Sequence, residues 1–114
     1  MRIVLATTLA LLLATPYSGA AFIGPTESGD SGTVAEVAET PLGTYVRLVG
    51  SLEAHLREDY YRFRDRTGSI RVEIEPDVWQ GRDITPNTVI EITAEVDRSL
   101  QGRYLWVKSF VVVD

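Results

Sequence analysis

The sequence predicts an all-β domain that begins with a short helix. After residue 44, apolar and polar residues alternate in five segments, and this period of two gives each strand one apolar face. Turn-forming residues separate the segments, and the clearest turn is Arg66-Thr67-Gly68, which joins two alternating runs as a hairpin. Five strands with one apolar face each form a sheet that buries one side and exposes the other.

Residues 1–21 are predicted to be a signal peptide that is removed on export. Arg2 supplies a positive charge, residues 3–14 are an apolar run, and small residues before Ala20 and Ala21 suit cleavage after either alanine. The alternative is an uncleaved anchor or a buried helix, but the run is shorter than the roughly twenty residues that a membrane span needs. We therefore expect an exported protein with no membrane span after cleavage.

The rest of the chain is predicted to be a tail and one folded domain. Residues 22–32 are rich in Gly, Ser and Pro and poor in apolar residues, which predicts a flexible tail. Residues 33–114 are predicted to form the domain. It begins with a helix, because Val34, Val37 and Ala38 have helical spacing and Pro41 ends the segment.

The first strand is predicted over residues 44–56. Its expected inward residues are Val46, Leu48, Gly50, Leu52 and Leu56. Its expected outward residues are Tyr45, Arg47, Ser51, Glu53 and His55. Gly50 lies midway along the strand, where a long strand can bend sharply. A bent first strand shared by both halves of a five-stranded sheet closes a small Greek-key barrel, so the predicted fold is the OB-fold.

The remaining strands are expected to follow as two hairpins. They are predicted over residues 60–65, 69–75, 88–97 and 103–113. The segment around Trp79 stands in place of the helix that usually joins strands three and four of an OB-fold. We expect Trp79 to plug one end of the barrel.

Three residues of the second strand are expected to have structural roles. Tyr61 and Phe63 share one face of the strand and are expected in the core. Asp65 shares that face, and a carboxylate facing inward needs hydrogen-bond donors. We expect it to accept hydrogen bonds from the Thr67-Gly68 backbone in the turn.

The composition argues against several kinds of function. The chain has no cysteine, which removes disulfides, thiol catalysis and cysteine metal sites. Without Arg2, 11 − 1 = 10 basic residues stand against 16 acidic ones, a net charge of −6. Nucleic-acid binders take most of their affinity from phosphate contacts and are typically basic, so no nucleic-acid partner is expected.

Several stretches resemble one known family in their order and spacing. They are "AFIGP", "VRLVGSLEAHLREDYYRFRDRTGSIRVEIE", "VWQGRDITP" and "IEITAEVD". Together they resemble the bacterial OB-fold (BOF) family, small periplasmic stress-tolerance proteins of the YgiW/YdeI type. The similarity runs from residue 22 to about residue 112, which is nearly all of the chain after the predicted signal peptide.

The resemblance implies a five-stranded OB barrel in the periplasm that supports tolerance of envelope and oxidative stress. It also implies binding of a small ligand rather than nucleic acid. The family has no catalytic motif. We therefore expect no enzyme activity, no catalytic residue and no cofactor. The chain departs from the family at Ala94, where glycine is usual, and at Trp106, where a polar residue is common and where we expect an exposed indole.

The predicted ligand site is the outward face of the second and third strands, the usual binding face of OB-folds. Arginines interleaved with an aromatic side chain suit stacking and the binding of an anionic group. The residues expected to contact a saccharide, an anion or a cationic species are Tyr60, Arg62, Arg64, Arg71 and Glu73. The alternative is that the arginines only keep the edge soluble by pairing with Glu73, Glu75 and Asp59.

No metal site is predicted. His55 is the only histidine of the chain, and a lone outward histidine without cysteine partners is seldom a ligand. Glu73 and Glu75 point the same way on one strand. The sequence leaves open whether these carboxylates or His55 bind a cation.

A protein–protein adaptor is the alternative function. Tyr104 and Trp106 are expected to face outward on the last strand beside Lys108, and aromatic residues are enriched at interfaces. In this alternative the two aromatic residues dock an envelope protein. A monomer is expected in either case.

Overall fold

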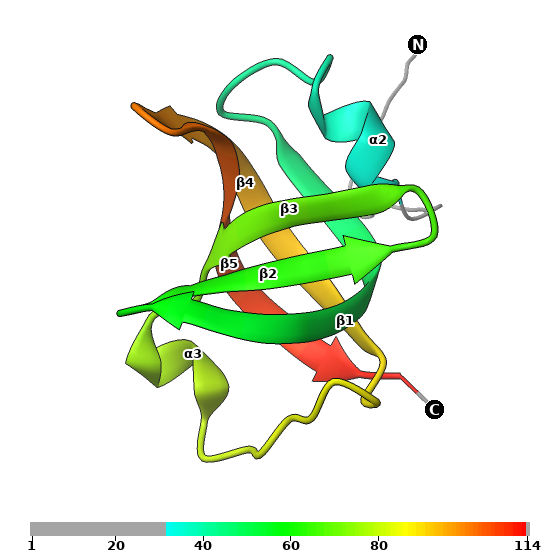
Figure 1. Cartoon of the computed structure of the whole chain (residues 1–114), viewed down its shortest axis with the longest axis vertical. Helices are drawn as coiled ribbons and strands as arrows, with labels where there is room; N and C mark the ends of the chain where they lie inside the picture. The colour runs from blue at the N-terminus through cyan, green and yellow to red at the C-terminus, as the bar shows by residue number, and fades with distance from the viewer. Residues whose placement is uncertain (1–31, 114) are drawn as a thin grey trace, which may run out of the picture. The chain divides into compact units, whose positions relative to one another are not determined.

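The computed structural model describes residues 32–113. The predicted signal peptide and the predicted tail up to residue 31 lie outside the described residues. The elements are α2 (Val34–Val37), β1 (Tyr45–Arg57), β2 (Tyr60–Asp65), β3 (Gly68–Glu73), α3 (Pro76–Trp79), β4 (Ile90–Ser99) and β5 (Gly102–Val112). The strands close into a barrel in the order β1-β2-β3-β5-β4, with α2 and α3 on different sides of it (Figure 1).

The barrel closes through one parallel contact. β3 and β5 run parallel and pair at Val72 with Leu105 and at Glu73 with Trp106, whereas the other neighbouring strands are antiparallel. A five-stranded Greek-key barrel whose fifth strand returns beside the third is an OB-fold. The predicted fold class, with a short N-terminal helix, is therefore confirmed.

β1 changes its partner midway because Gly50 has no side chain. Residues 45–50 pair with β4, and residues 51–57 pair with β2. A Cβ atom at Gly50 would overlap the backbone carbonyl oxygen of Arg64 and come within 2.8 Å of Cζ of Phe63. Glycine therefore lets β2 lie against β1 at the bend, as the sequence predicted.

The core fills the inside of the barrel with aliphatic side chains around one phenylalanine. The largest fully buried side chains are Phe63, Leu48, Ile74, Ile90, Ile92, Leu105, Val37, Val72, Val96 and Val107. None of the buried residues in the described part of the chain is polar or charged. Burial of each large apolar side chain is worth roughly 1.5–3 kcal/mol, so packing alone can hold a barrel without disulfides.

Two β-bulges in β1 overturn the predicted inward face of Leu56 and place the exposed His55 beside Tyr61. The register against β2 shifts between Leu52 and Ala54 and again between His55 and Arg57. Each extra residue reverses the alternation of the strand. His55 therefore lies opposite Tyr61, and Leu56, which was expected inward, is exposed.

Arginine side chains hold both short helices to the barrel, which the sequence did not indicate. Arg82 donates hydrogen bonds to the carbonyl oxygens of Val78 at 3.0 Å, Trp79 at 2.9 Å and Phe110 at 2.8 Å. Its guanidinium also stacks on the Phe110 ring. α3 is thereby tied to β5, and its last carbonyl groups are satisfied although the helix is only one turn long. Arg103 donates in the same way to carbonyl oxygens at the end of α2.

Within residues 32–113, no helix is long and apolar enough to cross a membrane.

Candidate functional site

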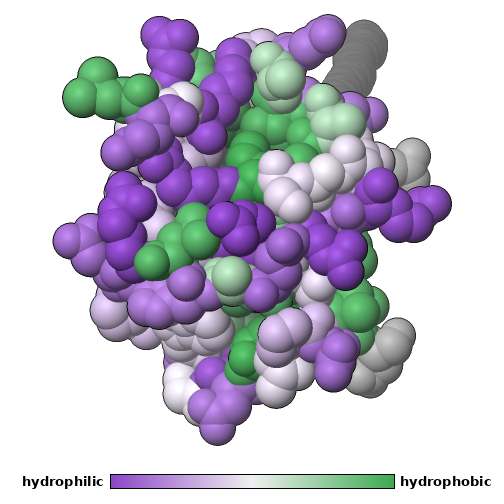
Figure 2. Space-filling model, in the orientation of Figure 1, coloured by the Kyte–Doolittle hydropathy of each residue, from purple (hydrophilic) through white to green (hydrophobic). Residues whose placement is uncertain are grey.

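The register of β2 and β3 brings the five predicted ligand contacts onto one outward surface, which we call the hairpin face. Tyr60 lies opposite Glu73, and Arg62 lies opposite Arg71. Arg64 follows on the same side of β2, toward the turn. Because the hairpin has no bulge, the period of two placed these residues correctly. Hydrophilic side chains cover much of this hairpin (Figure 2).

Arg71 is held in a cage at the base of the hairpin face. Its guanidinium lies 5.2 Å from the centre of the Tyr60 ring and 5.0 Å from that of Tyr104. The two terminal nitrogens donate to Oε1 of Gln101 at 3.1 Å and to Oγ of Ser99 at 2.6 Å. Arg71 is therefore occupied by internal contacts, and Tyr60 is part of the same stack.

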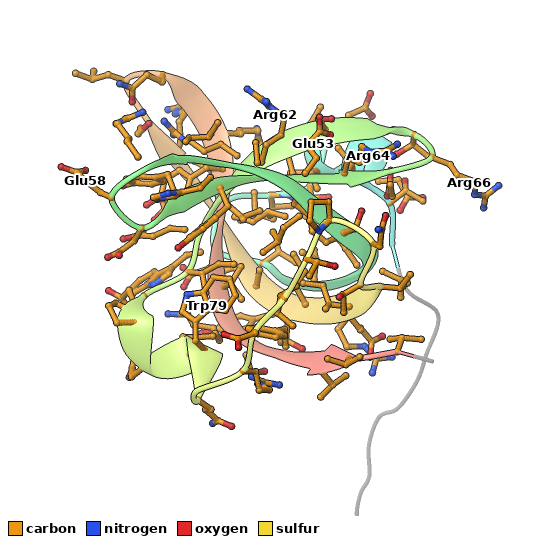
Figure 3. The ribbon with its side chains drawn as sticks, turned by 60° about the horizontal axis from the view of Figure 1, so that its bottom comes forward. Glu53, Glu58, Arg62, Arg64, Arg66 and Trp79 are labelled. Carbon is orange, nitrogen blue, oxygen red and sulfur yellow. The ribbon has the colours of Figure 1, made fainter. Side chains whose placement is uncertain are left out.

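The other arginines of the hairpin are more exposed than Arg71 and have fewer partners. Nε of Arg64 lies 3.4 Å from Oε1 of Glu53, in a pair that is open to solvent on both sides. Arg62 and Arg66 form no hydrogen bond or ion pair with other described residues, and both extend away from the ribbon (Figure 3). Glu53 on β1 is thus the carboxylate that pairs with an arginine of this face. It is not one of the carboxylates expected from the sequence, which were Glu73, Glu75 and Asp59.

The opposite end of the hairpin face is acidic. Burial raises the pKa of Glu73, and the nearby carboxylates of Glu75, Asp59 and Asp97 raise it further, whereas Lys108 opposes the shift. Like charges close together disfavour ionisation of each member of the group. The face is therefore positive toward the turn and negative toward its base.

Asp65 ties the hairpin turn to the start of α2. Its Oδ1 accepts hydrogen bonds from the backbone of Thr67 at 2.7 Å and from the Thr67 hydroxyl at 2.6 Å. Its Oδ2 accepts one from the backbone of Val34 at 2.9 Å. Burial alone would raise the pKa of Asp65, but these bonds and one from the Gly68 backbone lower it overall. The predicted bonds within the turn are confirmed, and the bond to the helix is an addition.

Aromatic rings pack beside α3, where Trp79 was expected to plug the barrel. The Trp79 ring meets Tyr61 edge-on at 5.3 Å and Phe110 at 5.6 Å, measured between ring centres. His55 stacks on the other side of Tyr61 at 4.7 Å. Trp79 packs against the core as expected, and the bulges of β1 add His55 to this group.

The aromatic residues of β5 are held by their neighbours. The Tyr104 hydroxyl donates to Oδ2 of Asp97 at 3.3 Å, and burial followed by the Asp97 charge raises the pKa of Tyr104 to about 12. Trp106 is half-buried, and Nζ of Lys108 lies 3.1 Å above the centre of its ring. The expectation of an exposed indole is thus wrong, because Lys108 covers it. Docking of a partner protein on these residues stays a prediction.

The described residues contain no cluster of three or more His, Asp or Glu side chains arranged to hold a metal ion. Nε2 of His55 lies 2.7 Å from the carbonyl oxygen of Glu58, so one ring nitrogen is engaged within its own turn.

Comparison with known proteins identifies relatives along most of the chain. The family model described as bacterial OB fold (BOF) protein matches residues 14–112. The calcium-regulated OB-fold protein CarO of Pseudomonas aeruginosa is 34% identical over 102 residues, which cover 90% of this chain and 88% of that protein. The solved structure of the hypothetical protein ygiW from E. coli is 32% identical with a TM-score of 0.71, over 75% of this chain and 91% of that one.

More distant structures share only the fold. A murine DNA-binding protein bound to double-stranded DNA is 18% identical with a TM-score of 0.54, over 75% of this chain and 49% of that one. At this identity the likeness carries the barrel architecture and no ligand.

Proposed function

The chain belongs to the bacterial OB-fold (BOF) family, and we propose that it is a non-enzymatic periplasmic binding protein that contributes to envelope and oxidative stress tolerance. The ligand is a small molecule held on the hairpin face. Export is supported by the predicted signal peptide at residues 1–21. A binding role without catalysis is supported by the absence of a catalytic motif in the sequence.

One observation carries the choice of face, namely the pairing of two arginines. Arg62 lies directly opposite Arg71 on neighbouring strands, and like charges in this position destabilise a sheet. The rings of Tyr60 and Tyr104 offset part of the cost at Arg71. Arg62 receives no such compensation from the described residues, so an anionic group bound there would relieve the repulsion.

The charges along the hairpin face limit the ligand further. An anionic group, or a saccharide that carries one, fits the end with Arg62 and Arg64. A cationic group fits the base, where Glu73 lies among other carboxylates. The name of the Pseudomonas relative refers to calcium regulation, so calcium belongs among the cations to be tested. Nucleic acid is a poor candidate, because the whole chain carries a net charge of −5.

Calorimetric titration tests this function on the chain from residue 22 onward, which includes the whole described barrel. The probes are muramyl dipeptide, inorganic phosphate, calcium, a cationic peptide and a short single-stranded oligonucleotide. We expect saturable binding of at least one anionic probe, and a roughly 10-fold loss in the double variant Arg62→Gln/Arg64→Gln, as for the loss of charge-assisted hydrogen bonds.

The matched control is Arg98→Gln, because Arg98 is an exposed arginine on β4, outside the β2–β3 hairpin. It should bind like the unmodified protein. Equal affinity of the double variant and the control would remove the hairpin face as the site. Tight binding of the oligonucleotide alone would contradict the ligand class.

A further inference from the structure

A hollow lies beside the tip of the β2–β3 hairpin, at the place where β1 leaves β4 to pair with β2. Its volume is about 550 Å³, which falls in the range of small-molecule sites. Its lining residues come from the chain before α2, the bend of β1, the hairpin turn and the residue before β4: Gly32, Thr33, Val49, Gly50, Ser51, Arg64, Asp65, Arg66, Thr67 and Val89.

The apolar part of this hollow consists of valines that the fold does not bury. Val49 is 37% exposed and Val89 is 43% exposed, although both lie in or next to strands. Apolar surface is also visible just below the hairpin tip, at the right edge of the molecule (Figure 2). Burial of such surface by a ligand is favourable at about 25 cal/mol per Å².

The carboxylate in the polar part of the hollow is already engaged by donors of the protein. Asp65 is the one carboxylate among the described lining residues, and it already accepts bonds from Thr67 and from the Val34 backbone. These donors lower the pKa of Asp65, so its carboxylate stays ionised and its charge is stabilised within the protein.

Arg66 is the free cation of this site. It forms no hydrogen bond or ion pair within the described chain, and it extends from the hairpin tip (Figure 3). Arg64 shares its charge with Glu53 but keeps one side of its guanidinium exposed. A guanidinium beside an apolar floor suits a carboxylate or a phosphate group with a hydrocarbon part attached.

We infer that this hollow is a second ligand site, which shares Arg64 with the hairpin face and takes a small amphipathic anion. The anionic head pairs with Arg66 and with the open side of Arg64. The hydrocarbon part covers Val49 and Val89. The backbones of β1 and β2 are in contact at Gly50. They form a rigid floor for the hollow, because they cannot move closer together.

Methyl and amide NMR tests the inference on the chain from residue 22 onward. The probes are octanoate and octyl phosphate, each below its critical micelle concentration. Two controls carry one feature each: inorganic phosphate has the charge without a hydrocarbon chain, and octyl glucoside has the hydrocarbon chain without a charge. We expect saturable shifts at Val49, Val89 and Arg66 with octanoate or octyl phosphate, and much weaker shifts with either half. Whichever head binds more tightly identifies the anion as carboxylate or phosphate.

Three variants separate this site from the hairpin face. Arg66→Gln should weaken the amphipathic anion roughly 10-fold, as for the loss of one charge-assisted hydrogen bond, and Val89→Ser should weaken it as well. Arg62→Gln should leave it unchanged, although the same variant is expected to weaken ligands of the hairpin face. The inference fails if neither amphipathic probe shifts the valines, if octyl glucoside binds as tightly, or if Arg62→Gln has the larger effect. All three variants should keep the dispersed amide spectrum of the folded barrel.

Discussion

Both ends of the β2–β3 hairpin carry an arginine, but the surroundings of the two arginines differ. At the base, Arg71 lies between two tyrosine rings and donates to Ser99 and Gln101. At the tip, Arg66 extends from the turn with no partner in the described chain. An arginine in an alternating strand can thus be a structural element or an available cation, and the difference comes from what the rest of the barrel places beside it.

The cause of this difference is the shape of the closed sheet. The turn between β4 and β5 folds over the base of the hairpin and brings Ser99, Gln101 and Tyr104 to Arg71. None of the described strands covers the tip, where β1 has turned from β4 to β2 at Gly50. The arginine at the base is therefore held by its neighbours, whereas Arg66 at the tip has no such partner in the described chain.

The largest expected effect comes from closing the bend beneath the tip. Gly50→Ala should destabilise the fold by about 3 kcal/mol, because the new methyl group overlaps the Arg64 backbone and must push β1 and β2 apart. Urea unfolding followed by circular dichroism measures the change. Val49→Ala, on the exposed side of the same strand, is the control and should cost far less. Equal stability of the two variants would show that the backbones are not in tight contact.

The next effect concerns the carboxylate that fixes the turn. Asp65→Asn should cost about 2 kcal/mol at neutral pH, because it removes charge-assisted hydrogen bonds to Thr67 and Val34. Asp83→Asn, an exposed aspartate without such bonds, should cost almost nothing.

The pH dependence of the same variant has a definite sign. The folded pKa of Asp65 is lowered, so its stabilisation is present above the unfolded pKa of about 3.9 and is lost as the pH falls through the folded pKa. The stability difference between the unmodified protein and Asp65→Asn should therefore shrink below about pH 4. A difference that stays constant down to pH 2 would contradict the assignment.

A smaller effect separates two arginines that face each other across the hairpin. Arg71→Gln should cost about 1 kcal/mol by loss of the stacks on Tyr60 and Tyr104. Arg62→Gln should leave the free energy of unfolding unchanged or slightly raised, since it removes a like-charge neighbour. Denaturant titration of both variants measures the comparison. A larger cost for Arg62→Gln would reverse the roles given to these two arginines.

The smallest effect is expected at the tip itself. Arg66→Gln should change the free energy of unfolding by less than about 0.5 kcal/mol, as for surface positions without specific contacts. Thermal unfolding is sufficient to detect a departure from this value. A clear loss of stability would mean that Arg66 has a structural partner and is not available to a ligand.

The barrel was predictable because its signals are local. Alternation identified all of the strands, and Gly50 marked the bend, since a strand in that place tolerates no Cβ. The bulges were not predictable in the same way, because Glu53 and Leu56 continue the alternation of the sequence and become extra residues only when β1 is aligned with β2. The inward face predicted for Leu56 was therefore wrong, whereas His55 is exposed as predicted but stacks on Tyr61.

The hairpin face was predictable in its membership and not in its partners. The period of two placed Tyr60, Arg62 and Arg64 on one side, and the turn placed Arg71 opposite. The contacts that occupy Arg71 come from the turn between β4 and β5, and no spacing within the hairpin encodes them. For the same reason the hollow at the tip was not predictable from the sequence, because four separate parts of the chain line it.

Ligands of the hairpin face are expected to contact Arg62 and Arg64, while Arg71 keeps its contacts with the two tyrosine rings. The most direct measurement is an NMR titration that follows the arginine Nε–Hε signals as muramyl dipeptide, inorganic phosphate and calcium are added in turn. Nε of Arg71 is buried without a hydrogen-bond partner, so its signal should be distinct. We expect saturable shifts of the Arg62 and Arg64 signals with an anionic probe and a nearly unchanged Arg71 signal. A dominant shift of Arg71, or no shift of any arginine with any probe, would contradict it.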